Sequence, residues 1–164
     1  MNGKSSDDEK SKQSATILIL KALVPYTSQN LKLAYNPSEF FDELERTSGY
    51  SRRTLIQTFA RAKKQRLINM DPSPALTTKG RQQVQPYIAR RLRDGGELMV
   101  IFDIPQAFTV QRRRFRELLR YLGFEQVQRS VWISPNDHTN VVNEAISELK
   151  LDEWVQVYEA ARIK

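Results

Sequence analysis

Asp103 is the residue of this 164-residue sequence whose placement first suggests metal chemistry. It lies in the segment VIFDIP, where an apolar run typical of a β-strand ends in one carboxylate and Pro105 follows. A metal-dependent nuclease holds Mg²⁺ through several hard oxygen ligands, so a single carboxylate is too few. The local alternative is that Asp103 caps the following turn or pairs with an arginine of residues 112–114. Lone acids at strand ends are more often such local acceptors.

A second group of candidate residues is basic and lies between residues 51 and 66. Ser51 is typical of a helix N-cap, and Leu55, Ile56 and Phe59 follow at helical spacing as the expected buried side. Residues at the start of such a helix can reach base edges and phosphates, whereas a purely protein-binding helix is the alternative. The candidate DNA-binding residues of this segment are Ser51, Arg52, Arg53, Thr54, Gln57, Arg61, Lys63 and Lys64.

A third group is an arginine run, with five arginines among residues 112–120. Phe115, Leu118, Leu119 and Leu122 recur at helical spacing, which places the arginines on the solvated side of a helix. Like charges at such spacing repel unless something neutralises them. The run therefore indicates either a contact with phosphates or an acidic surface, or an ordinary charged helix face.

Composition narrows the classes of chemistry that one chain can supply. The sequence has no cysteine, which excludes disulfides, thiol catalysis and cysteine-ligated zinc. Its one histidine, His138, excludes a metal cluster built on several histidines within one chain. His138 is expected in a loop or at a helix cap, without a catalytic role. The net charge of +7 favours a polyanionic partner. No apolar stretch suits a membrane span or a signal peptide, so we expect a cytoplasmic protein without a membrane partner.

The first half of the sequence reads as a set of helices followed by a hairpin. Residues 1–13 are polar and are expected to form a disordered tail, and an apolar helix from residue 14 is stopped by Pro25. A helix capped by Asn36 or Ser38 precedes the turn at Gly49 and the basic helix. Two helices joined by a short glycine-containing turn are a helix-turn-helix candidate, and the segment after them predicts a β-wing.

The second half alternates strands and helices in the order strand, helix, strand, strand, helix, strand, which is the split βαβ or ferredoxin-like plan. Its first helix is expected to begin at a Thr109 cap and to end at Gly123. Trp132 and Trp154 fall in predicted strands and are interpreted as core or dimer-face residues rather than as stacking platforms for single-stranded nucleic acid.

The motifs of both halves resemble known families. The segment LTTKGR, residues 76–81, resembles the "L-x-T-x-x-G-R" pattern that follows the wing in winged-helix DNA-binding domains, which adds Lys79 and Arg81 to the candidate DNA-binding residues. The Phe102-Asp103 pair and the segment GFEQVQRSVW resemble the small CRISPR spacer-acquisition subunit, in which two copies of the acid are thought to meet across a dimer axis. The order of the two halves resembles the phenylacetate-catabolism repressors, the PaaX-like family. Full-length members carry a further C-terminal region, so no acyl-CoA effector site is carried over and the small-molecule effector stays open.

We therefore predict an α+β protein with an N-terminal winged helix-turn-helix (residues 14–88), a linker (89–95) and a ferredoxin-like dimerisation domain (96–164). The predicted function is sequence-specific binding of double-stranded DNA as a homodimeric transcriptional regulator of the repressor type, without a cofactor or catalytic residue. The alternative is a metal-dependent nuclease, or a structural subunit of a CRISPR spacer-acquisition complex, that uses Asp103 with Mg²⁺.

Overall fold

The computed structural model describes residues 13–24, 28–161 and 163, and it divides the chain into two compact units, Met1–Thr77 and Thr78–Lys164. Most of the predicted tail, and the predicted stop at Pro25, lie outside the described residues. The mixture of helices and strands confirms the predicted α+β class. Among the described residues, no helix is both long and apolar enough to span a membrane.

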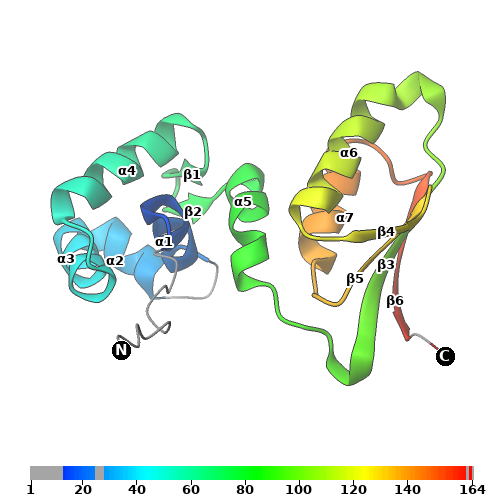
Figure 1. The fold of residues 1–164 in the computed structure, drawn as a ribbon. Coiled ribbons are helices and arrows are strands. Elements are labelled where there is room, and N and C mark those ends of the chain that lie inside the picture. Colours follow the sequence, from blue (N-terminus) through cyan, green and yellow to red (C-terminus); the bar gives the residue numbers. More distant parts are fainter. Residues whose placement is uncertain (1–12, 25–27, 162, 164) are drawn as a thin grey trace, which may run out of the picture. The chain divides into compact units, whose positions relative to one another are not determined.

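Four helices and a short hairpin make up the first unit (Figure 1). The helices are α1 (Ala15–Ala22), α2 (Gln29–Tyr35), α3 (Pro37–Ser48) and α4 (Arg52–Lys64), and the hairpin strands are β1 (Ile68–Asn69) and β2 (Ala75–Leu76). β1 and β2 pair antiparallel, with Ile68 opposite Leu76.

Local hydrogen-bonding groups define where α3 and α4 begin. The Asn36 side chain accepts a hydrogen bond from the backbone N–H of Glu39 at 3.3 Å, and Ser51 Oγ accepts one from Thr54 N at 3.2 Å. These bonds satisfy N–H groups that have no partner within the helix. Gly49, between the two helices, has φ +70°, a left-handed conformation that glycine adopts without strain. Asn36, rather than Ser38, is therefore the cap of α3.

Aromatic residues of α3 and α4 form much of the first unit's core. Phe40, Phe41 and Leu44 are buried on α3, and the ring of Phe41 meets that of Phe59 edge-on, with centroids 5.6 Å apart. The prediction for α4 was wrong at one position, because the Ile56 side chain is 42% exposed. Thr58 and Ala62 fill the buried side of α4 instead. They lie three and seven residues after Leu55, the spacing that keeps side chains on one helix face.

Helix α2, which no sequence pattern predicted, is held by polar contacts with α3. Lys32 Nζ lies 2.5 Å from Glu43 Oε2, and Gln29 Nε2 donates to Glu43 Oε1 at 3.1 Å. α2 buries only Leu33 and has no side-chain cap. Its formation therefore depends on a tertiary contact that no local pattern indicates.

The second unit begins with helix α5 (Thr78–Ile88) and continues with a four-stranded antiparallel sheet. The predicted winged-helix domain extends to residue 88, whereas the chain divides after Thr77 and places α5 with the sheet. One reason is the ion pair between Arg81 Nε on α5 and Glu144 Oε1, 3.0 Å apart within this unit.

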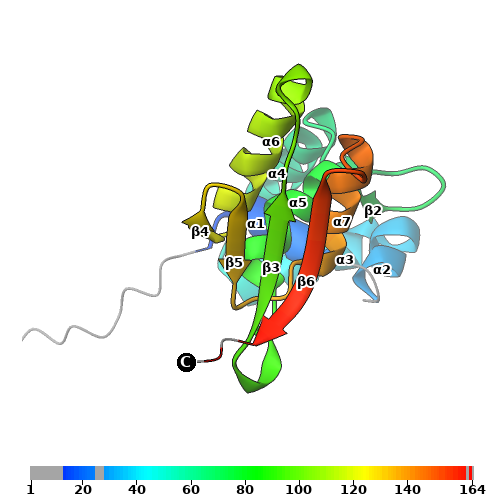
Figure 2. The same cartoon turned by 90° about the vertical axis from the view of Figure 1, so that its right-hand side faces the viewer.

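The sheet has the strand order β4-β5-β3-β6, and two helices pack on one of its faces (Figures 1 and 2). The strands are β3 (Gly96–Phe102), β4 (Glu125–Gln128), β5 (Val131–Ser134) and β6 (Val155–Ala161), and the helices are α6 (Thr109–Tyr121) and α7 (Thr139–Glu148). Along the chain they follow as strand, helix, strand, strand, helix, strand. Two short 3₁₀ turns, Arg93–Gly95 and Gln106–Phe108, precede β3 and α6.

Alternation along β3 determines which side chains form the second core. Leu98, Val100 and Phe102 are buried, and Phe102 meets Phe115 of α6 edge-on at 5.7 Å. Trp132 is 2% exposed and belongs to this core, as one of the two predicted interpretations has it. Trp154 lies just before β6 instead of within a strand, with its ring centroid 4.4 Å from that of Phe108.

The predicted Thr109 cap of α6 was wrong. Thr109 is the first residue of α6, and its hydroxyl donates to the carbonyl of Gln106 at 2.6 Å. The preceding residue, Phe108, occupies the cap position without a side-chain hydrogen bond. The hydroxyl therefore closes the preceding turn, a local alternative that threonine side chains commonly take.

Candidate nucleic-acid interface

Helix α4 presents a broad polar and basic face to solvent. The helix contains no acidic residue. Its exposed residues are Arg53, Thr54, Ile56, Gln57, Ala60, Arg61, Lys63 and Lys64. Three of its cations lie in the last turn, where positive charge is favoured by the partial negative charge of the helix C-terminus. The arrangement gives a positively charged surface on a rigid element, which suits a polyanion.

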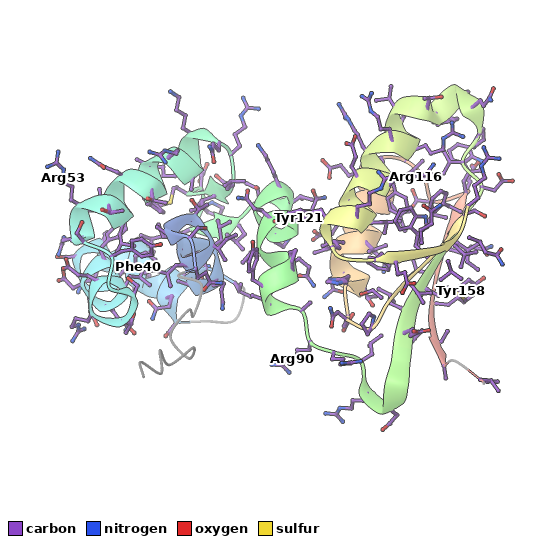
Figure 3. The ribbon with its side chains drawn as sticks, in the orientation of Figure 1. Phe40, Arg53, Arg90, Arg116, Tyr121 and Tyr158 are labelled. Atoms are coloured by element: carbon purple, nitrogen blue, oxygen red, sulfur yellow. The ribbon has the colours of Figure 1, made fainter. Side chains whose placement is uncertain are left out.

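The central stripe of this face combines groups of different chemistry. Gln57 and Lys64 follow Arg53 by four and eleven residues and therefore lie on the same side of the helix. Arg53 extends away from the first unit (Figure 3). Ile56 and Ala60 flank this line with apolar surface. A guanidinium group, a side-chain amide and apolar side chains are the groups that distinguish bases in a major groove.

Arg52 differs from the other candidates because α3 engages it. Its guanidinium pairs with Asp42, and one of its terminal nitrogens donates to Ser38 Oγ at 3.0 Å. Its backbone N–H also donates to Glu45 Oε1 at 2.8 Å. Arg52 therefore fixes the start of α4 against α3, which orients Arg53 and Gln57.

Lys79 and Arg81 lie on α5 in the second unit, whereas the other candidates lie on α4 or at its cap in the first unit. Arg81 pairs with Glu144 and also donates to Thr78 Oγ1 at 3.2 Å. Lys79 lines a groove of about 550 Å³ among α5, α6 and α7. Arg81 therefore makes contacts within the second unit, and a role of either residue in DNA binding stays a prediction.

The hairpin that follows α4 carries no cation. Residues 68–76 contain one acid, Asp71, and no lysine or arginine. The hairpin is anchored at its base, where Thr77 Oγ1 donates to the carbonyl of Arg66 at 2.7 Å. The hairpin therefore adds no positive charge to the basic face of α4.

Asp103 lies just after β3, and its side chain is exposed. Its backbone N–H donates to the carbonyl of Trp154 at 3.0 Å. Its carboxylate forms no ion pair with a described arginine, and Arg112 donates instead to the carbonyl of Ile104 at 3.5 Å. Within the described part of the chain, no three acidic or histidine side chains gather as metal ligands. A site shared between two copies stays a prediction.

A comparison with known protein families matches the part of the second unit that follows α5. The family model of the PaaX protein central Cas2-like domain matches residues 91–164. Residues 91–164 are therefore similar to the central domain of the PaaX family. The match confirms the predicted PaaX-like family over these residues, and proteins of that family are in general transcriptional regulators. No curated protein matches the chain.

His138 is a buried polar residue of the PaaX-like domain that the sequence did not reveal as buried. It precedes α7 and is 1% exposed, with its ring centroid 5.5 Å from that of Phe124. Its Nδ1 lies 3.4 Å from Gln85 Nε2, which also donates to the carbonyl of Asp137 at 3.1 Å. Nε2 is buried without a hydrogen-bond partner among the described residues. The His138 imidazole and the Gln85 side chain therefore connect α5 to the start of α7.

The stability of the PaaX-like domain should depend on pH through His138. Burial lowers the pKa of the imidazole below its ordinary value of 6.5, and the nearby Asp137 and the Leu122 backbone only partly oppose this shift. A lowered pKa in the folded state means that the unfolded chain binds the proton more tightly. The stabilising contribution is therefore complete above about pH 6.5 and is lost as the pH falls toward the folded-state pKa.

Thermal unfolding between about pH 7.5 and 5.5, a range that spans the ordinary pKa of histidine, tests this expectation. The melting temperature of the chain should fall over that interval, and the fall should be smaller in His138→Gln, whose amide does not titrate. The assignment is direct because the sequence contains one histidine. Equal pH dependence in the two proteins would contradict it.

Proposed function

We propose that the chain is a DNA-binding transcriptional regulator, which works as a homodimer and reads double-stranded DNA with α4. The observation that carries the proposal is the exposed face of α4, which has four cations, no acid and two groups suited to base edges. The PaaX-like second domain supports a regulatory role, because that family consists in general of regulators that bind DNA and oligomerise. Such a regulator would act in the cytoplasm, where the DNA is.

The arrangement of the first unit supports a winged helix-turn-helix. α3 and α4 are joined by a short turn at Gly49, and the β1–β2 hairpin follows α4. In such domains the second helix of the pair enters the major groove. Because the hairpin carries Asp71 and no cation, we assign the phosphate contacts of this unit to Arg61, Lys63 and Lys64.

Each part of the α4 face has a distinct role in the proposed complex. Arg53 and Gln57 would donate to acceptors on base edges, as arginine does to guanine and glutamine to adenine. Ile56 is apolar yet exposed, which suits contact with a thymine methyl group. The cations of the last turn supply affinity that is independent of sequence and sensitive to salt.

The open face of the sheet supports a dimer. Strand pairing sets Met99 beside Ile133 and Tyr158, and Ile101 beside Val131, on the side away from Leu98 and Val100. α6 and α7 pack on the opposite side, and Figure 2 looks onto the open face. Tyr158 is 45% exposed there and points away from the helices (Figure 3). The strand order supports a ferredoxin-like domain. The open face also carries Gln156, opposite Ile101, and self-complementary packing of this largely apolar face would give a two-fold interface.

Salt-dependent DNA binding tests the proposed function. If the dimer neutralises about 6 phosphates, the logarithm of the association constant should fall with the logarithm of salt concentration with a slope of roughly −5. Fluorescence anisotropy with labelled duplexes between about 50 and 200 mM salt measures this slope. A slope near zero, or no binding at the lowest salt, would contradict the proposal.

A further inference from the structure

The arginine run of α6 forms a second basic surface, separate from α4. Arg112, Arg113, Arg116 and Arg120 line one shallow hollow of about 260 Å³ together with Thr109. Among the described residues, no acid lines this hollow. The fifth arginine of the run, Arg114, lines the groove among α5, α6 and α7 instead. The run therefore divides between two sides of α6, and four of its members converge.

Two of these arginines lie over the ring of Trp132. The Cζ atoms of Arg116 and Arg120 lie 5.9 and 5.7 Å from the centroid of the Trp132 ring. Figure 3 shows Arg116 on α6 near the sheet. Arginine stacked on an aromatic face loses side-chain freedom before any ligand arrives. Its remaining N–H groups then bind a ligand at a smaller entropic cost.

The protein itself neutralises little of the charge of this hollow. Within the described part of the chain, the ion pair on this helix joins Arg113 Nε to Glu117 Oε1 at 3.9 Å, and the two side chains are 70% and 60% exposed. Exposed pairs of this kind contribute little. The Arg116 Nε is buried and has no hydrogen-bond partner among the described residues. Four guanidinium groups at helical spacing also repel one another, so an anion that binds among them relieves this repulsion.

We infer that this hollow, Thr109 with Arg112, Arg113, Arg116 and Arg120, is a phosphate-binding site that holds the backbone of double-stranded DNA. Arginine is suited to this task because its planar fork binds phosphate oxygens in pairs. Trp132 is itself 2% exposed, which leaves no aromatic face for bases to stack on. The site therefore contributes affinity without reading sequence. The inference rests on the proposed function and extends it by a second DNA contact that α4 does not supply.

The test is Arg112→Gln combined with Arg113→Gln in the full chain, which leaves the two arginines on Trp132 unchanged. The matched control is Arg114→Gln, which removes a charge from the same helix outside the hollow. The magnitude of the log–log salt slope should fall by about 0.9 for each phosphate that the double variant no longer neutralises, on specific and random duplexes alike. The control should keep the slope of the unchanged chain. Circular dichroism and the melting temperature confirm that the variants fold.

Each outcome decides for or against the assignment. Equal salt slopes of DNA binding in the double variant and the control would overturn the assignment of the hollow. If only variants of α4 lost DNA binding, the proposed function would still stand. If the α6 double variant loses DNA binding while Arg53→Ala binds as the unchanged chain does, the result would support the hollow and contradict the role of α4. A small-anion site would give a different pattern. Inorganic phosphate would raise the melting temperature of the control but not of the double variant, while the salt slope of DNA binding would be the same in both. That result would overturn the DNA assignment.

Discussion

Arg53→Ala should weaken binding to a specific duplex by roughly 5- to 150-fold, the loss of about 1–3 kcal/mol expected for one bidentate contact with a base. Arg53 is exposed on the central stripe of α4, whereas its neighbour Arg52 is engaged by Asp42 and Ser38. The substitution should therefore leave the fold unchanged. Binding to random duplexes should fall much less, since the substitution removes only one charge.

Two further variants separate the roles of charge and shape at this position. Arg53→Lys keeps the charge but loses the planar fork, so it should retain binding to random DNA and lose discrimination between duplexes. Arg46→Ala removes an exposed arginine of α3 and serves as the matched control. Competition assays with specific and random duplexes measure the ratio of the two affinities for each variant. If Arg53→Ala bound the specific duplex as the unchanged chain does, α4 would not be the reading helix.

Tyr158→Glu should dissociate the proposed dimer. Tyr158 lies on the open face of the sheet opposite Met99, so the substitution would place a carboxylate from each copy in an apolar interface. An uncompensated buried charge costs about 3–5 kcal/mol, which corresponds to a rise of more than about 100-fold in the dimer dissociation constant. DNA affinity should fall with it, because the two α4 helices would no longer bind as one unit.

Tyr87→Glu is the matched control for the interface. Tyr87 lies on α5 and is 51% exposed, similar to the 45% of Tyr158, but it is not on the sheet. Analytical ultracentrifugation should show dimers for the unchanged chain and the control, and monomers for Tyr158→Glu at the same concentration. Dimers in all three samples would show that the chain self-associates through a surface other than this face.

Local chemistry explains which parts of the fold could be predicted from the sequence. Asn36, Ser51 and Gly49 were predictable because a cap or a left-handed turn depends on a few adjacent residues. The apolar spacing of Phe115 and Leu119 was equally informative, since α6 buries one regular stripe.

Tertiary contacts explain what the sequence did not reveal. Ile56 follows Leu55 in the same apolar run, and only the packing of α4 shows that Leu55 is buried and Ile56 is exposed. The predicted winged-helix domain includes α5, whereas α5 lies in the second unit, where Arg81 pairs with Glu144 across 63 positions of sequence. The burial of His138 likewise depends on Gln85, a contact between residues 53 positions apart.

The candidate site was predictable in outline only. A basic helix could be recognised from its composition, but the engagement of Arg52 by α3 depends on how two helices pack. The division of the α6 arginines between two sides follows from helix geometry together with the position of Trp132. The roles assigned to these side chains remain predictions that the variants above test.

Selection of bound duplexes from a random pool, with the full chain at moderate salt, measures the central claim most directly. Two copies that each insert α4 into a major groove should enrich an inverted repeat whose half-sites are about 10 base pairs apart, or a multiple of that spacing. The same selection with Arg53→Ala should yield a weaker motif with the same spacing. Enrichment of no motif, by a chain that is folded and dimeric, would contradict the account.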